Sequence, residues 1–340
     1  MKAVFSETQM QHCPKRYLAR GNLTGYPDQP ERTRRLKAGA EAAGLAFIQP
    51  DSFGRESITA LHPDRYVDFL EGGFAEWIAV PGAFEEMMTS IRPLESPAAY
   101  PRDILGRAGW HQQDFSCPLT SDTWASVKAS ADTALMAAKL VLDGERAAYA
   151  LSRPPGHHAF AERAGGFCFL NNSGLAAQAL RARHDRVAIL DIDVHHGNGT
   201  QGIFYARPDV LTVSIHADPR DYYPFFYGLA EQRGEGAGEG FNLNLPLPVK
   251  SGDGPWSLAL GQALVRISDF APGALVLALG LDAHEADPLK GGNVTTEGFR
   301  LMAREIAGLG LPTVIVQEGG YLTDQLSGNL TAFLEGFQHG

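Results

Sequence analysis

Cysteine is scarce in this sequence, whose 340 residues include only Cys13, Cys117 and Cys168. Their number is odd and none stands in the paired spacing of a zinc ribbon. This argues against a disulfide framework and a thiolate zinc site. We therefore expect a protein of a reducing compartment, namely the cytoplasm.

Long apolar runs and basic clusters are also missing. No run approaches the ~20 apolar residues of a membrane span, and the apolar start at Met1–Phe5 is too short for a signal sequence. The formal net charge is −10, and lysine and arginine form no continuous run. We expect neither nucleic acid nor a membrane as a partner, although the acidic surface would tolerate a cationic substrate.

Internal repeats and low-complexity linkers are absent as well, so we expect one domain over residues 1–340. A hydrophobic content of 44% suffices for one large α/β core. Predicted strands alternate with predicted helices, which favours a mostly parallel sheet with helices on both faces. The strands are expected at Lys2–Phe5, Leu45–Ile48, Ala147–Leu151, Val187–Ile192, Val210–Ile215, Ala274–Leu279 and Thr313–Val316. The helices are expected at Glu31–Ala43, Ser57–Leu61, Arg65–Trp77, Thr123–Leu142, Asn171–Arg183, Thr200–Tyr205, Pro255–Phe270, Thr296–Leu309 and Gln325–Phe337.

The segment Pro81–Pro118 lacks a clear period and is rich in proline. It is too long for a plain connection, which predicts a functional or interface excursion. A partly ordered surface loop is the alternative.

A dense polar motif follows the apolar run Val187–Leu190. Asp193 and His195 stand two residues apart, so both point to the same side of an extended strand end. One oxygen and one nitrogen at a shared point are what a divalent metal needs. An Asp–His ion pair is the alternative, and His196 is interpreted as structural.

Other strand ends carry polar groups too, and ligands of parallel sheets bind at these ends. A rigid Pro-Pro-Gly loop presents His157 and His158, which can exchange protons near neutral pH. Asp282 follows an apolar strand and completes an Asp-His-Asp set with open positions, which suits a catalytic zinc. Tyr321 follows two glycines and can donate a hydrogen bond to an oxyanion. Two further polar residues, His284 and Asp287, are expected to be solvated loop residues.

These motifs resemble those of the histone deacetylase and acetylpolyamine amidohydrolase superfamily, which has the arginase/deacetylase fold. Asn198 makes the chain similar to class II and bacterial members. The matching stretches, in family order, are Arg153–Ala159, Gly166–Cys168 with Asn171–Asn172, Asp191–Thr200, Gly280–Asp282 and Glu318–Tyr321.

The resemblance implies a role for each motif residue. Asp193, His195 and Asp282 would bind one Zn²⁺, and Tyr321 would be the catalytic phenol. His158 would remove the proton of the attacking water. His157 and His158 would form hydrogen bonds with Asp191 and Asn198 respectively. The Gly166 carbonyl would accept the substrate amide N–H, and Phe167 and Tyr223 would form the tunnel walls. A structural K⁺ would be held by Asp191, Asp193, His195, Ser214 and Ile215.

The implied reaction is zinc-dependent removal of an acetyl or other acyl group from an N-acylated amine, either an acetylpolyamine or an acyl-lysine. The resemblance also implies a homodimer formed through the excursion. Acidic residues that select polyamines in relatives fall here near Leu105 and Ser116. A substrate-selecting glutamate of another branch falls at Leu289, which is therefore also expected to contact the substrate. Asp103 or Asp114 could replace these acidic residues.

Two other functions remain as alternatives. A binuclear manganese ureohydrolase of the arginase branch would need a further Asp ligand where Gly197 stands. A non-catalytic metal-binding regulator on this fold would be expected to lack Tyr321 or one of the tandem histidines.

Overall fold

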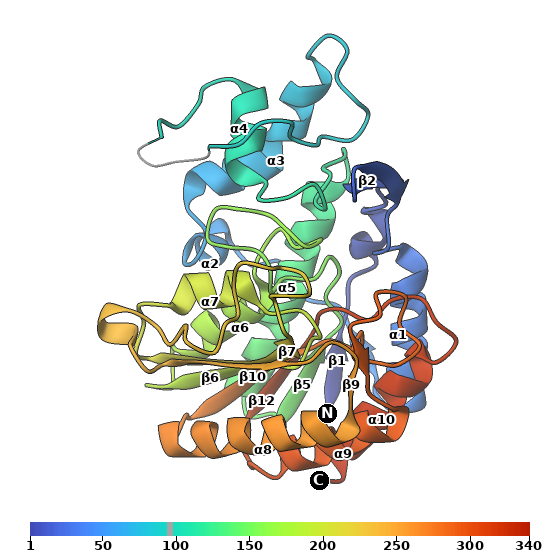
Figure 1. Ribbon diagram of the computed structural model, residues 1–340, viewed down its shortest axis with the longest axis vertical. Helices are drawn as coiled ribbons and strands as arrows, with labels where there is room; N and C mark the ends of the chain where they lie inside the picture. Colours follow the sequence, from blue (N-terminus) through green and yellow to red (C-terminus); the bar gives the residue numbers. More distant parts are fainter. Residues whose placement is uncertain (94–97) are drawn as a thin grey trace.

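Eight parallel strands form the central sheet of the computed structural model, which describes residues 1–93 and 98–340 (Figure 1). The strands lie in the order β4-β1-β5-β12-β10-β6-β7-β8. This arrangement confirms the predicted single α/β domain with a parallel sheet. Their bounds are β1 Lys2–Val4, β4 Phe47–Ile48, β5 Ala147–Ala150, β6 Val187–Asp191, β7 Val210–Ala217, β8 Asn242–Leu247, β10 Ala274–Leu279 and β12 Thr313–Gln317.

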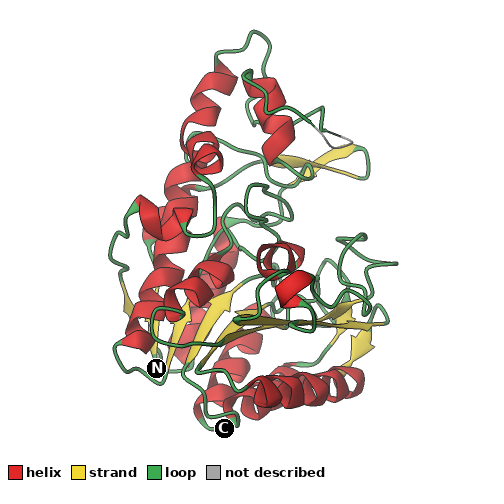
Figure 2. Ribbon diagram, turned by 90° about the vertical axis from the view of Figure 1, so that its left-hand side faces the viewer, coloured by secondary structure: helices red, strands yellow, loops and turns green. Residues whose placement is uncertain are grey.

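Helices cover both faces of the sheet (Figures 1 and 2). One face carries α5 (Thr123–Leu142), α6 (Asn172–Leu180) and α7 (Asn198–Phe204). The other face carries α1 (Pro30–Ala42), α8 (Asp253–Phe270), α9 (Thr296–Ala307) and α10 (Leu326–Gln338). Among the described residues, no helix has both the length and the apolar character to cross a membrane.

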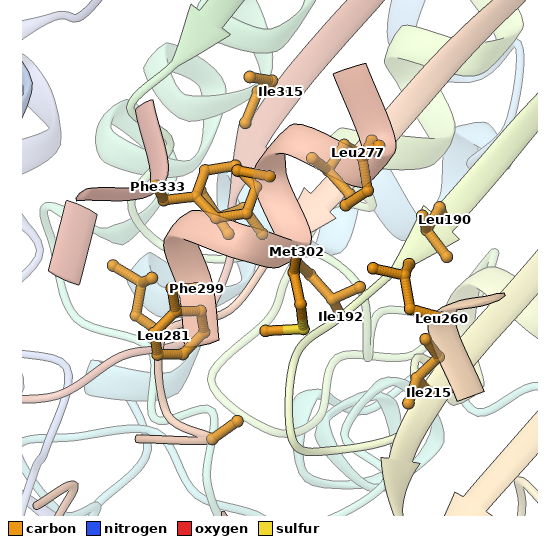
Figure 3. Close-up of a cluster of buried hydrophobic side chains, with 14 of the residues drawn as sticks. Leu190, Ile192, Ile215, Leu260, Leu277, Leu281, Phe299, Met302, Ile315 and Phe333 are labelled. Atoms are coloured by element: carbon orange, nitrogen blue, oxygen red, sulfur yellow. The ribbon is translucent and has the colours of Figure 1, made fainter. Parts of the chain in front are cut away.

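The core is split between the two faces because successive strand residues point to opposite sides. In β10, Leu275 and Leu277 belong to one buried cluster and Val276 to the other. Figure 3 shows Leu277 in one buried cluster with Met302 and Phe299 of α9, in which Phe299 lies beside Leu281. Burial of each such side chain contributes roughly 1.5–3 kcal/mol.

Strand register brings the polar motifs to one edge of the sheet. Asp191, at the end of β6, lies beside Ala278 of β10 and Ser214 of β7. Gln317, at the end of β12, lies beside Leu279 of β10. The loops that follow these strands therefore begin side by side, and they carry most of the candidate site residues.

The remaining elements include two small sheets and β8, none of which the sequence predicted. The antiparallel hairpin of β2 (Arg16–Ala19) and β3 (Asn22–Gly25) is short and half-buried or exposed, so it has no apolar period to reveal it. In β8, Pro246 is tolerated because the strand lies at the sheet edge. The other elements are β9 Ser251–Gly252, β11 Gly292–Asn293, η1 Glu7–Gln11, η2 Gly236–Gly238, α2 Arg55–Thr59, α3 Asp64–Ile78 and α4 Ile104–His111.

The excursion, in the upper part of Figure 1, packs into a buried cluster that it shares with α3, α5 and α6. Helix α4 lies inside it, and Met87 pairs with Leu119 through two backbone hydrogen bonds. Both side chains are fully buried with residues of α3. Positions 94–97 of the predicted excursion lie outside the described residues. The predicted dimer interface on this segment stays a prediction.

Candidate active site

Three buried groups at the ends of β6 and β10 meet at one point. Asp193 and His195 follow β6, and Asp282 follows β10. A ligand atom from each lies within 4.8 Å of the other two. His195 Nδ1 is 3.0 Å from Asp193 Oδ1 and 3.2 Å from Asp282 Oδ2. Two buried carboxylates this close are costly unless a cation joins them.

The unsatisfied atoms of this cluster fit a metal ion. Asp282 Oδ2 is buried and accepts no hydrogen bond within the described part of the chain. Asp282 Oδ1, in contrast, accepts the Val194 N–H at 3.0 Å. A side chain at Gly319 would collide with the carboxylates of Asp193 and Asp282, so the backbone approaches them as closely as only glycine allows. One nitrogen and two carboxylate oxygens suit zinc with open positions.

The two carboxylates differ electrostatically. Burial and the charge of Asp193 raise the pKa of Asp282. Burial would also raise the pKa of Asp193, but His157 and His195 hold that pKa well below its ordinary value. Such opposite shifts are expected for two acids that share one site.

The tandem histidines lie beside this cluster with the predicted partners. His157 Nδ1 is 2.8 Å from Asp191 Oδ2, and His158 Nδ1 is 2.7 Å from Asn198 Oδ1. The centroids of the two imidazole rings are 4.0 Å apart. Two rings at this distance cannot both carry a charge cheaply.

Burial and charge separate the roles of the two histidines. Burial opposes the charge on His157, but the carboxylates of Asp191 and Asp193 raise the pKa of His157 to about 10. Burial and the neighbouring His157 lower the pKa of His158 well below its ordinary value. With Asn198 accepting from Nδ1, the Nε2 atom of a neutral His158 is free to accept a proton.

Glu318 holds the tandem-histidine loop, a role that sequence reasoning missed. Its Oε2 accepts the N–H groups of Gly156 at 2.6 Å and His157 at 3.0 Å, and its Oε1 accepts the Ser173 hydroxyl at 2.7 Å. Burial raises the pKa of Glu318 to about 7. Glu318, His157 and Cys168 also have metal-ligand spacing, but both oxygens of Glu318 are already engaged.

Tyr321 is buried and packs beside Phe167 and Arg32. Its ring centroid is 5.9 Å from that of Phe167, and the Arg32 guanidinium lies 5.4 Å from the Tyr321 ring centroid. Burial and the charge of Asp282 raise the pKa of Tyr321 well above its ordinary value. The phenol therefore keeps its proton and can donate a hydrogen bond.

A cavity of about 430 Å³ joins these groups, since His158, His195 and Tyr321 all line it. The other lining residues include six aromatic ones, Tyr17, Phe115, Phe167, Tyr222, Tyr223 and Phe225. The lining includes the four residues predicted to touch substrate, which are Gly166, Phe167, Tyr223 and Leu289. The unpredicted hairpin adds Tyr17, Leu18, Ala19 and Arg20.

Asp114 brings a carboxylate into the cavity wall. It accepts the Gly166 N–H at 3.1 Å and the Tyr223 hydroxyl through Oδ2, and the Ser116 N–H through Oδ1 at 2.9 Å. Asp103, the other acidic candidate, is exposed and caps α4. Only Asp114 of the two reaches the site.

Two residues of the predicted potassium set lie together. Asp191 pairs in register with Ser214, and both line a small cavity of about 10 Å³. The Ser214 hydroxyl is 2.8 Å from His216 Nδ1. His196 is buried next to this cavity, and its Nε2 is 3.1 Å from Asn244 Oδ1. The potassium ion itself stays a prediction.

The expectation that His284 and Asp287 are solvated is wrong. Their exposed fractions are 4% and 2%. His284 Nδ1 accepts the Ala286 N–H at 3.1 Å, and its ring stacks on Phe299. Asp287 accepts two backbone N–H groups, described below. Packing by α9 and by the segment before Tyr321 buries this loop, and neither contact is visible in the local sequence.

Comparison with known proteins places these features in context. A sequence model of the histone deacetylase domain matches residues 26–337. The chain is 48% identical over 338 residues to a Burkholderia pseudomallei (strain 1710b) protein named acetylpolyamine amidohydrolase, a match that covers 99% of this chain and 98% of that one. It is 42% identical over 342 residues to acetylpolyamine amidohydrolase 1 of Pseudomonas aeruginosa, with 99% of each chain covered. A crystal structure of acetylpolyamine aminohydrolase from Burkholderia pseudomallei superposes with a TM-score of 0.96 at 48% identity, covering 99% of this chain and 98% of that chain.

Proposed function

Because this chain belongs to the histone deacetylase family, we propose that it hydrolyses the amide bond of N-acetylated polyamines, with one zinc ion held by Asp193, His195 and Asp282. One observation carries this proposal. A single aromatic cavity reaches His158, His195 and Tyr321 and holds the Asp114 carboxylate in its wall. The names of the full-length relatives agree with the substrate class.

Zinc in this position would supply a Lewis acid that polarises the amide carbonyl and lowers the pKa of a water molecule. His158 accepts the proton of the attacking water at Nε2 and later donates it to the leaving amine nitrogen. His157 is kept protonated by its contact with Asp191, and its positive charge stabilises the negative charge that develops during the reaction. Tyr321 donates a hydrogen bond to the amide oxygen as that oxygen becomes an anion. The products are acetate and the free amine.

The substrate lies along the cavity in this proposal. The Gly166 carbonyl accepts the amide N–H, while Phe167 and Tyr223 pack against the methylene chain. Asp114 and the aromatic walls favour a second, charged amine further along that chain, by ion pairing and cation–π attraction. A structural potassium held by Asp191, Asp193, His195, Ser214 and Ile215 is proposed to stabilise the loop after β6.

A substrate panel tests the proposed function. The zinc-loaded protein is assayed with acetylputrescine, acetylspermidine, an acetyl-lysine peptide and longer acyl-lysine peptides, and kcat/KM is measured for each. We expect kcat/KM for acetylated polyamines to exceed that for the acetyl-lysine peptide by at least ~10-fold, because the peptide lacks a distal ammonium for Asp114. A preference for the peptide would refute the polyamine assignment and favour an acyl-lysine deacetylase.

Asp114→Asn tests the origin of this selectivity. We expect kcat/KM for acetylputrescine to fall by about 10–100-fold, as for a lost hydrogen bond to a charged group. The value for N-acetylbutylamine, which has no distal charge, is expected to change much less. Asp103→Asn removes the same charge from the same excursion and keeps a good helix cap, so it serves as the control. Equal losses for both substrates would show that Asp114 does not read the ammonium.

A further inference from the structure

Asp287 is a buried carboxylate to which the mechanism above assigns no task. It follows Asp282 by five residues on the loop after β10, and its exposed fraction is 2%. A buried carboxylate is costly unless hydrogen bonds satisfy its oxygens. Both oxygens of Asp287 are satisfied, and each by a residue that lines the cavity.

The first bond reaches the backbone of Tyr321. Asp287 Oδ2 accepts the Tyr321 N–H at 2.9 Å. The second bond reaches the cavity wall, because Asp287 Oδ1 accepts the Leu289 N–H at 2.8 Å. The Asp287 carboxylate thus holds the backbone of Tyr321, which carries the phenol, and the backbone of Leu289 in the cavity wall.

The residues before Tyr321 are held from other directions. Asp193 Oδ2 accepts the Gly319 N–H at 2.7 Å, and Arg32 donates to the carbonyl oxygens of Glu318 and Gly320. Gly320 has a φ of +112°, a conformation that glycine adopts without strain. A conformationally permissive residue does not by itself fix the residue that follows it. The hydrogen bond from the Tyr321 N–H to Asp287 therefore holds the backbone of Tyr321 in place.

The second bond extends to a metal ligand. The Leu289 carbonyl accepts the Tyr222 hydroxyl at 2.7 Å. The Tyr222 ring stacks on His195, with 5.1 Å between ring centroids and 20° between planes. The loop from Asp282 to Leu289 therefore ties Tyr321 to two of the three candidate zinc ligands.

We propose that Asp287 is a positioning residue that sets the place of the Tyr321 phenol relative to the metal cluster. The proposal rests on the proposed function, in which Tyr321 donates to the reacting oxygen. A carboxylate is required because two N–H donors face its two oxygens. An asparagine has one acceptor oxygen and would turn its NH₂ group against one of the donors.

Asp287→Asn tests this role with Glu285→Gln as the matched control. Glu285 lies on the same loop and is exposed, so its substitution makes the same acid-to-amide change without touching Tyr321. For Asp287→Asn we expect kcat on acetylputrescine to fall by about 10–100-fold, as for a misplaced catalytic group. KM is expected to change less than about threefold, as for an interaction made mainly in the transition state. Zinc content by elemental analysis is expected to stay at one ion per chain, and Glu285→Gln is expected to behave as wild type.

A double-mutant cycle separates positioning from a general structural role. The readout is the affinity of a trifluoromethyl ketone analogue of acetylputrescine, whose hydrate mimics the tetrahedral species. Asp287→Asn is expected to weaken binding in the wild-type background but to have no further effect in Tyr321→Phe. An equal loss in both backgrounds, or a wild-type kcat in Asp287→Asn, would overturn the proposal.

Two further outcomes have clear meanings. If Asp287→Asn does not fold, Asp287→Ser, which keeps one hydroxyl acceptor, replaces it with the same expected results. A wild-type protein that binds zinc but hydrolyses no acetylated amine would refute the proposed function. A fully active Asp287→Asn would refute only the positioning role.

Discussion

Replacement of Tyr321 by phenylalanine is expected to remove nearly all turnover and to leave the zinc content unchanged. Removal of one oxyanion donor costs about 10²–10³-fold in kcat. The phenol is well placed for this role, because burial and Asp282 keep it protonated and the cavity reaches it. Its ring packing on Phe167 is retained in the variant, so the cavity shape should persist.

Steady-state kinetics on acetylputrescine, combined with elemental analysis, measures this effect. Tyr205→Phe is the control, since Tyr205 lies at the end of α7 and outside the cavity lining. Wild-type turnover in Tyr321→Phe would contradict the assigned role. A loss of zinc together with activity would mean that Tyr321 acts by holding the metal cluster.

Removal of the metal is expected to abolish activity and to lower thermal stability. Without a cation, the buried carboxylates of Asp193 and Asp282 repel each other around a single imidazole. A ligand present at 1,000 times its Kd stabilises the folded state by about 4 kcal/mol. For a chain of this size we therefore expect chelation to lower Tm by roughly 5–10 °C.

Thermal unfolding with and without a chelator measures this shift, and one equivalent of zinc should restore both Tm and activity. Asp282→Asn is the matched control: its weakened site should make Tm insensitive to the chelator. Elemental analysis decides the metal count. Two manganese ions per chain would refute the zinc site and favour the ureohydrolase alternative.

The positions of the main motifs could be predicted because a parallel sheet brings the carboxyl ends of its strands to one edge. The apolar runs Val187–Leu190 and Ala274–Leu279 predicted two buried strands of a parallel sheet. The polar residues just beyond them, Asp193 and Asp282, were therefore expected at the same edge of the sheet, and the structure shows that the two strands are neighbours. His157 and His158 could also be identified, because they are adjacent in the sequence and lie in a Pro-Pro-Gly loop that follows the predicted strand Ala147–Leu151.

Other parts of the site depend on contacts between residues far apart in the chain. The hairpin Arg16–Gly25 has no periodic pattern, yet it lines the cavity. Asp103 and Asp114 looked alike in the sequence, and only the fold of the excursion showed that Asp114 reaches Tyr223. Glu318 was part of a recognised motif, but its bonds to the tandem-histidine loop cross 161 and 162 residues.

The sequence by itself determined the fold class and the order of the motifs, since local apolar runs and the residues after them suffice for both. Only the tertiary structure decided which polar side chains are buried and what they face. Asp287 is the clearest case: its burial and its bond to Tyr321 arise from packing across 34 residues. No local pattern encodes a bond of this kind, because it forms only when two separate strand ends meet.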